Sequence, residues 1–216
     1  MSFSTMLNQL STGMVTTIII FVMTLVCSLP LGLLISFGRM SKSFVLRNIA
    51  KIYISIMRGT PLMLQLLVVY FGPYYIFGIS ISSSYRAYAV ILAFAINYAA
   101  YFAEIYRGGI ESMPQGQYEA ARVLGYTKSQ TFVKIIMPQV IKRILPSVTN
   151  EVITLVKDTS LAFSIAYAEM FTVAKPIAAS QKSMVPFMAA AVFYYVFNFI
   201  VAAMMELWEK KMSYYK

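Results

Sequence analysis

A mainly apolar stretch of the chain, residues 15–37, contains no Asp, Glu, Lys or Arg. A helix that crosses a bilayer needs about 20 such residues, so this stretch predicts a transmembrane helix. Four further apolar runs follow, at residues 62–79, 85–106, 146–173 and 186–208. With 59% hydrophobic residues in 216, the sequence predicts an all-α integral membrane protein, with five transmembrane helices in a single transmembrane domain over residues 1–216.

The basic residues are distributed unevenly around these five runs. Fourteen Lys and Arg residues lie between the first and second runs, between the third and fourth, or after the fifth, and three lie on the opposite side. Because cytoplasmic loops of membrane proteins are enriched in Lys and Arg, the N-terminus is predicted outside and the C-terminus in the cytoplasm. The net charge of +10 then belongs to loops that face anionic lipid, and no nucleic acid is expected as a partner.

Several kinds of chemistry are disfavoured by residues that the chain lacks. It has no His and a single cysteine, Cys27, inside the first apolar run, so neither a His- or Cys-based metal site nor a disulfide within the chain is expected. No segment matches the Gly-x-x-x-x-Gly-Lys-Ser/Thr loop that binds nucleotide phosphates. We find no combination of acid, base and nucleophile either, so no catalytic residue is assigned and the chain is not expected to be an enzyme.

A long polar stretch, residues 107–143, is predicted to be a cytoplasmic loop that contains a short helix. Residues 117–125 read Gln-Tyr-Glu-Ala-Ala-Arg-Val-Leu-Gly. Glu119 is expected in the first turn, where negative charge suits the helix dipole, and Gly125 can take the left-handed conformation that ends a helix. Ala120 and Ala121 favour helix and add little bulk, so the helix could closely enter a groove of another protein. An ordinary connector at the membrane surface is the alternative.

Other parts of the sequence add to this pattern. Ile-Ile-Met-Pro stands at residues 135–138, and Met-Arg-Gly-Thr-Pro-Leu-Met-Leu-Gln-Leu at residues 57–66. Together with Glu-Ala-Ala and a glycine six residues after the glutamate, the loop resembles the EAA loop of ATP-binding cassette importer permeases. Met137 stands where the family pattern has Leu, a swap of similar volume that we expect to be tolerated. Residues 57–66, 103–110 and 150–161 are similar to the polar amino acid branch of these permeases.

This resemblance implies a type I importer permease fold in a multi-pass protein of the bacterial cytoplasmic membrane. It also implies a complex with a second permease, either a copy or a homologue, with two cytoplasmic ATPase subunits that bind ATP and Mg²⁺, and with an extracytoplasmic amino acid-binding protein. The chain itself is expected to bind no cofactor. The residues implied to couple it to the ATPase are Glu119, Ala120, Ala121 and Gly125. The resemblance leaves open which amino acid is carried.

Polar side chains within the apolar runs are the candidates for substrate binding, because an ionisable group at membrane depth is costly and is a functional candidate by default. Asn97, Tyr101 and Glu104 are spaced to share one stripe of the third helix. Asp158 and Ser160 lie inside the fourth, on a polar stripe with Thr154 and Lys157 that could line the same cavity. We expect these residues to line a cavity in which a carboxylate pairs with the substrate ammonium and polar groups hold its carboxylate.

Each acidic candidate also has a structural alternative. Glu104 could pair with Arg107 three residues later, and Lys157 could neutralise Asp158 or Glu151 inside the bundle. A second function also uses these acids: an ion-coupled secondary amino acid transporter could take Glu104 or Asp158 as its proton or sodium site. That alternative leaves the spacing of the EAA loop unexplained.

Overall fold

The structure, a computed structural model, describes residues 2–212, and all of its regular elements are helical. In chain order the elements are α1 (Phe3–Arg39), α2 (Phe44–Gly59), α3 (Leu62–Phe77), α4 (Tyr85–Glu111), α5 (Gln115–Val123), α6 (Lys128–Gln130), a π-helical segment (Thr131–Ile136), α7 (Met137–Asp158), a 3₁₀ segment (Thr159–Ile165), α8 (Met170–Gln181) and α9 (Val185–Lys211).

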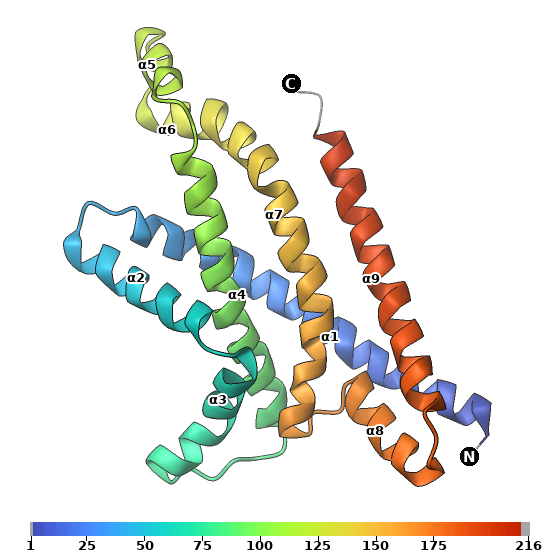
Figure 1. Cartoon of the computed structure of the whole chain (residues 1–216). Helices are drawn as coiled ribbons and strands as arrows, with labels where there is room; N and C mark the ends of the chain where they lie inside the picture. The colour runs from blue at the N-terminus through green and yellow to red at the C-terminus, as the bar shows by residue number, and fades with distance from the viewer. Residues whose placement is uncertain (1, 213–216) are drawn as a thin grey trace.

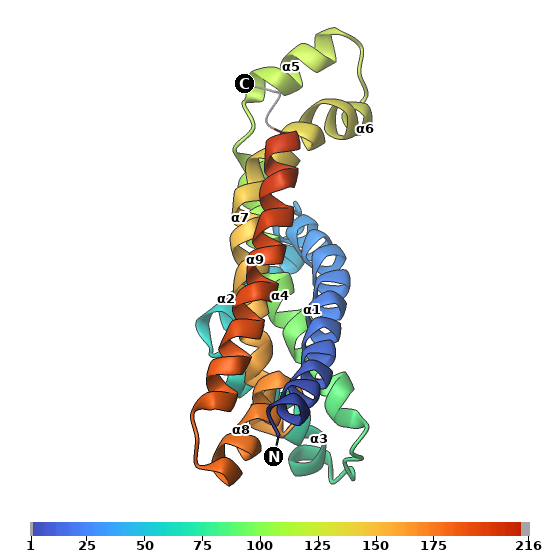
Figure 2. The same ribbon diagram turned by 90° about the vertical axis from the view of Figure 1, so that its right-hand side faces the viewer.

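Three long helices, α4, α7 and α9, lie side by side, and α1 crosses behind them at an angle (Figure 1). The short helices α5 and α6 project beyond one end of these helices, whereas α3 and α8 lie toward the other end (Figures 1 and 2). The loop that carries α5 is therefore displaced along the long axis from the apolar part of the protein.

Helices α1 and α4 share the most extensive helix–helix contact in the described chain. The face of α4 in this contact is rich in small residues, and Ala99, Ala100 and Ala103 are fully buried. Gly32 of α1 lies so close to α4 that a β-carbon at this position would stand 2.8 Å from Cβ of Phe102. Small residues let membrane helices approach each other without the help of a hydrophobic driving force.

The helices are long and apolar enough to cross a membrane, as the sequence predicts. By length and composition, α1, α4 and α9 could each span a bilayer, and up to five spans result if each of two bent helix pairs is one span. One pair is α2 with α3, bent by 108°, and the other is Lys128–Ile165 with α8, bent by 60°.

Several predicted helix boundaries are wrong. The third helix continues past residue 106 to Glu111, and the fourth begins at Met137, before residue 146. The first helix begins at Phe3, well before residue 15. The fourth run, residues 146–173, is not one helix: α7 ends at Asp158, and after the 3₁₀ segment the chain turns at Ala166, which has a φ of 54°. A new helix starts at Met170 because the Glu169 carboxylate accepts hydrogen bonds from the amides of Phe171 and Thr172.

The close approach of α1 to α4 predicts that Gly32→Ala destabilises the protein relative to Gly38→Ala. Both changes remove a glycine from a helix, which alone favours folding by about 1 kcal/mol. At Gly32 the new methyl group meets Phe102 and the Ala99 carbonyl, and overpacking of this kind costs about 1–3 kcal/mol. At Gly38 the nearest atom, Cβ of Ala50, is 3.8 Å away. Thermal melting in detergent should give the lower Tm for Gly32→Ala, and the reverse order would contradict the packing.

Candidate functional site

The most unusual backbone feature of the apolar region is the break between α2 and α3. The axes of the two helices are bent by 108°, and Thr60 and Pro61 between them have extended backbone conformations. Such a break leaves the last carbonyl groups of α2 and the first amides of α3 without partners inside their own helices. Inside a bilayer these groups need other partners, because lipid supplies none.

Two side-chain amides supply partners at the break. Asn97 of α4 donates hydrogen bonds to the Met57 carbonyl, at 3.0 Å, and to Oε1 of Gln65, at 2.9 Å. Gln65 in turn donates from Nε2 to the carbonyls of Met57 and Thr60, at 3.0 and 3.1 Å, and to the Thr60 hydroxyl at 2.8 Å. Asn97 is only 4% exposed. The network therefore fixes the break against α4.

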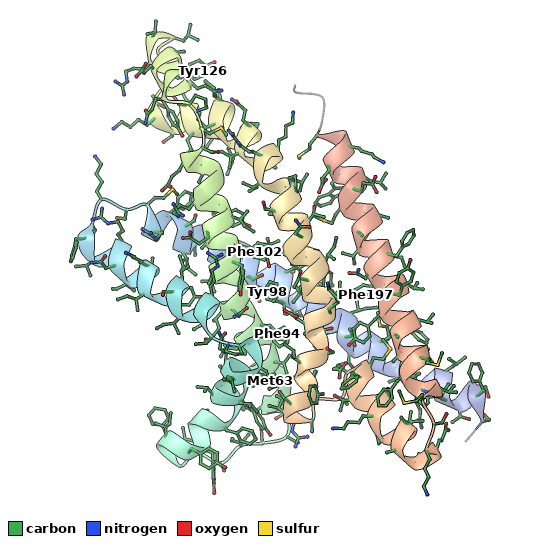
Figure 3. All side chains as sticks on the ribbon, viewed as in Figure 1. Met63, Phe94, Tyr98, Phe102, Tyr126 and Phe197 are labelled. Carbon is green, nitrogen blue, oxygen red and sulfur yellow. The ribbon has the colours of Figure 1, made fainter. Side chains whose placement is uncertain are left out.

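A cavity of about 290 Å³ lies beside the break. We call it the central cavity, and it is lined by Thr60, Pro61, Leu62, Asn97, Tyr98, Tyr101, Glu151, Thr154, Asp158 and Leu161. Figure 3 shows Phe94 below Tyr98 and Phe102 above it along α4. These aromatic residues lie on the side of α4 that faces α7, and all three belong to one buried core. The central cavity is thus formed by the break, α4 and α7 together.

Two carboxylates enter the central cavity from one face of α7. Glu151 and Asp158 are seven residues apart, two helical turns, and therefore lie on the same side of the helix. The Tyr98 hydroxyl donates a hydrogen bond to Oδ2 of Asp158 at 2.7 Å. In residues 2–212, no Lys or Arg nitrogen lies within 4.0 Å of either carboxylate. The suggested pairing of Lys157 with these acids is therefore not a close ion pair, although the charge of Lys157 still acts on Asp158 at longer range.

Three of the five predicted substrate-binding residues, Asn97, Tyr101 and Asp158, line the central cavity together. Thr154, which the sequence places on the same stripe as Asp158, also lines it. So does Glu151, which the sequence analysis considered only as a partner of Lys157. Glu151 precedes Asp158 by seven residues, so helical spacing counted back from Asp158 could have identified it.

Glu104 lies outside this lining, in a cluster of charges between α1 and α4. Its carboxylate is 2.6 Å from Nη2 of Arg107 and 3.8 Å from Nε of Arg39, and Arg107 also reaches Glu111 at 2.6 Å. The pairing with Arg107 is the structural alternative that the sequence predicts. The contact with Arg39 adds a link to the end of α1.

Ser160 also lies outside the central cavity, in the 3₁₀ segment after α7. It lines a second cavity of about 520 Å³, formed largely by apolar side chains of α8 and α9. Its hydroxyl donates a hydrogen bond to the Lys157 carbonyl at 2.8 Å. Asp158 and Ser160 are two residues apart, and two helical residues at this spacing point to different sides.

The cytoplasmic loop contains the short helix that its sequence predicts, α5, and Gly125 after it has the expected left-handed conformation, with a φ of 79°. The helix begins at Gln115, so Glu119 lies in its second turn and the predicted first-turn position is wrong. Glu119 and Ala120 are exposed, whereas Ala121 is buried against the rest of the loop.

The end of α5 presents apolar side chains to the surroundings. Val123 is 88% exposed and Leu124 is 73% exposed. The helix is held to α7 by Gln117 and Gln139, whose side-chain amides exchange two hydrogen bonds of 2.8 and 2.7 Å. An exposed apolar tip on a firmly attached helix is suited to contact another protein.

Residues 28–214 match the protein family described as "Binding-protein-dependent transport system inner membrane component". The chain belongs to this family. It is therefore a permease component of an ATP-binding cassette transporter and a multi-pass protein of the cytoplasmic membrane. Its all-α fold is that of type I importer permeases, as the EAA loop predicts.

Named relatives place the permease among amino acid systems. It is 33% identical over 208 residues to the L-cystine transport system permease protein TcyB of Bacillus subtilis (strain 168), over 95% of this chain and 87% of the relative. It is 38% identical over 194 residues to the octopine transport system permease protein OccM of Rhizobium radiobacter, over 85% of this chain and 79% of the relative.

Solved structures agree with this assignment. A crystal structure of an amino acid ABC transporter with histidines superimposes with a TM-score of 0.86 and 32% identity, over 98% of this chain and 99% of that one. The MetNI methionine ABC transporter in an inward-facing conformation shares the fold, with a TM-score of 0.72 and 18% identity over 99% and 100% of the two chains. These comparisons give no support to an ion-coupled secondary transporter.

The charge cluster between α1 and α4 predicts that Glu104→Gln lowers the thermal stability of the permease. Hydrogen bonds to charged groups contribute about 1.5–3 kcal/mol when partly buried, and the variant leaves Arg39 and Arg107 without their shared counter-charge. Glu206→Gln is the matched control, because Glu206 pairs with Lys210 at the surface, where ion pairs contribute little. Melting in detergent should give a lower Tm only for Glu104→Gln. Equal Tm values would show that the cluster does not hold α1 to α4.

Proposed function

We propose that this permease carries a polar amino acid into the cell by alternating access, driven by two separate ATPase subunits in the cytoplasm. The substrate class is supported by relatives named for L-cystine and glutamine transport and by the similar amino acid ABC transporter. A second permease, copy or homologue, and an extracytoplasmic amino acid-binding protein complete the complex. ATP and Mg²⁺ bind to the ATPase subunits, and the permease itself binds no cofactor and hydrolyses no ATP.

The observation that carries this proposal is the opposite polarity of the two sides of the central cavity. On one side are Asp158 and Glu151, with no basic partner within 4.0 Å among the residues described. On the other side α3 begins at Leu62. The amides of Leu64 and Gln65 donate to the Pro61 carbonyl, so the donors left for a substrate at the positive end of the helix dipole are those of Leu62 and Met63. An amino acid presents an ammonium and a carboxylate, so it fits between the acids of α7 and the start of α3.

The remaining lining residues divide into two roles. Tyr101 and Thr154 form walls that a substrate can contact. Asn97 is a positioning residue, because its amide nitrogen already donates to Met57 and Gln65 and so holds the break in place. Glu104 and Ser160 have no part in this binding site.

The same geometry supports five membrane crossings, with the N-terminus outside and the C-terminus in the cytoplasm. The ends of α1 and α4 lie together, because Arg39 reaches Glu104, so the chain must cross back between them. The start of α4 lies against α3, where Arg86 donates to the Tyr70 hydroxyl at 3.1 Å. Helices α2 and α3 together therefore form one crossing, with the break at its middle.

We assign the contact with the ATPase to α5 and to the residues that follow it. Glu119 and Ala120 are exposed there with Val123 and Leu124, whereas buried Ala121 supports α5 from within. Gly125 ends the helix. Because the Gln117–Gln139 pair ties α5 to α7, movement of α5 on ATP binding is passed along α7 to the acids of the central cavity. ATP then biases the permease between two packings that it can already adopt.

The proposal predicts that Asp158→Asn impairs uptake at the binding step. Loss of a charged hydrogen bond to the substrate ammonium costs about 1.5–3 kcal/mol, so the KM for uptake should rise by about tenfold or more. The measurement is ATP-driven uptake of radiolabelled L-glutamine, L-arginine and L-cystine, each in turn, by proteoliposomes that contain the permease with its ATPase and binding protein.

Glu206→Gln, an equivalent change from acid to amide near the end of α9, is the control and should leave the KM unchanged. An unchanged KM in Asp158→Asn would remove Asp158 from the site. If the wild-type complex moved none of the three amino acids, the substrate class would be wrong.

A further inference from the structure

Helix α2 has two different exposed faces. Its buried face, which includes Ala50 and Ile54, packs in the helix bundle. A second face is apolar, and its members at helical spacing, each more than half exposed, are Val45, Ile49, Ile52 and Ile56. A third face is polar and exposed, and we call it the α2 polar stripe: Arg47, Lys51, Ser55 and Arg58.

The α2 polar stripe lies within a membrane crossing if α2 and α3 together form one span. The two helices pass the length and composition test for a span only as a pair. The apolar face of α2 can contact lipid. Contact between the cations of the stripe and lipid would cost free energy. Charged side chains at membrane depth almost always face protein or a water-filled cavity.

Within residues 2–212 the cations of the stripe form no close ion pair, and only Arg58 interacts at longer range with carboxylates, those of Glu104 and Glu151. Among the residues described, Arg47, Lys51 and Arg58 have no carboxylate within 4.0 Å. At its inner end, the Arg58 guanidinium lies 5.3 Å from the ring centre of Tyr101, which lines the central cavity. At its outer end, Arg47 lies in the first turn of α2, close to the end of α1. The stripe therefore leads from the central cavity to the membrane surface on the side of α5.

We propose that the α2 polar stripe lines the water-filled passage through which the substrate leaves the central cavity for the cytoplasm. This inference rests on the proposed function for the identity of the substrate, but not for the existence of the passage. Three cations without a close ion-pair partner along a low-dielectric wall attract carboxylates and repel cations. The passage favours solutes that carry a carboxylate and disfavours leakage of small cations.

The test is the reactivity of single cysteines on neighbouring faces of α2. In a Cys27→Ala background, Ser55→Cys places a thiol on the stripe and Ile56→Cys places one on the apolar face next to it. Each variant is assembled with its ATPase in inside-out membrane vesicles and treated with a charged, membrane-impermeant methanethiosulfonate. Because the thiolate is the reacting form and does not form in lipid, Ser55→Cys should react roughly tenfold faster or more.

A second readout tests the charge of the passage. At Ser55→Cys, the rate with a sulfonate reagent is divided by the rate with a trimethylammonium reagent. Adding Lys51→Gln should lower this ratio by about threefold, because one cation a helical turn away favours the anionic reagent and repels the cationic one. Lys51→Cys and Ile52→Cys form an equivalent pair one turn earlier, should the first pair fail to assemble.

Equal rates at Ser55→Cys and Ile56→Cys, or a faster rate at Ile56→Cys, would overturn the passage. If Lys51→Gln left the ratio of the sulfonate rate to the trimethylammonium rate unchanged, the cationic character of the passage would be overturned. These results are separable from the proposed function. A reactive Ser55→Cys combined with an unchanged KM in Asp158→Asn would keep the passage and reject the substrate site, and the opposite combination would do the reverse.

Discussion

The structure depends on how the backbone hydrogen-bonding groups at a broken helix find partners inside a membrane. Lipid offers no hydrogen bonds, so the backbone groups released between α2 and α3 need partners from the protein itself. Gln65, just after the break, and Asn97 of α4 provide them for the carbonyls of Met57 and Thr60, and the first amides of α3 stay available to a substrate. Once these two side-chain amides are committed to the backbone, the start of α3 is fixed beside α7, and the acids Glu151 and Asp158 face it across a cavity.

The polar groups of the membrane region fall into two sets with different consequences. Some are paired within the chain: Glu104 with Arg107 and Arg39 holds α1 to α4, and Glu169 caps α8. Others, above all Asp158, Glu151 and the cations of α2, have no oppositely charged group within 4.0 Å in residues 2–212 and interact with such groups only at longer range. Paired groups stabilise the fold, and the groups without a close partner are those that we propose line the route of the substrate.

Much of this arrangement follows from the sequence alone. The apolar runs predict the membrane helices, and Glu-Ala-Ala followed by Gly125 predicts α5 and its end. Periodicity also groups Asn97 with Tyr101, but it cannot decide which neighbour a side chain meets. Glu104 shares their stripe and still pairs with Arg39, whose position depends on how α1 crosses α4. The turn at Ala166 likewise cannot be predicted from hydropathy, because residues 146–173 are mainly apolar on both sides of it.

The central claim is that this permease works as one part of an ATP-driven importer of amino acids. The most direct measurement is to purify the tagged chain from its native membrane in mild detergent and to identify stoichiometric partners by mass spectrometry. The account predicts an ATPase subunit with a nucleotide-binding Gly-x-x-x-x-Gly-Lys-Ser/Thr loop, together with a second permease or a second copy of this chain. Recovery of the chain alone, still able to accumulate an amino acid in vesicles under an ion gradient without ATP, would contradict it.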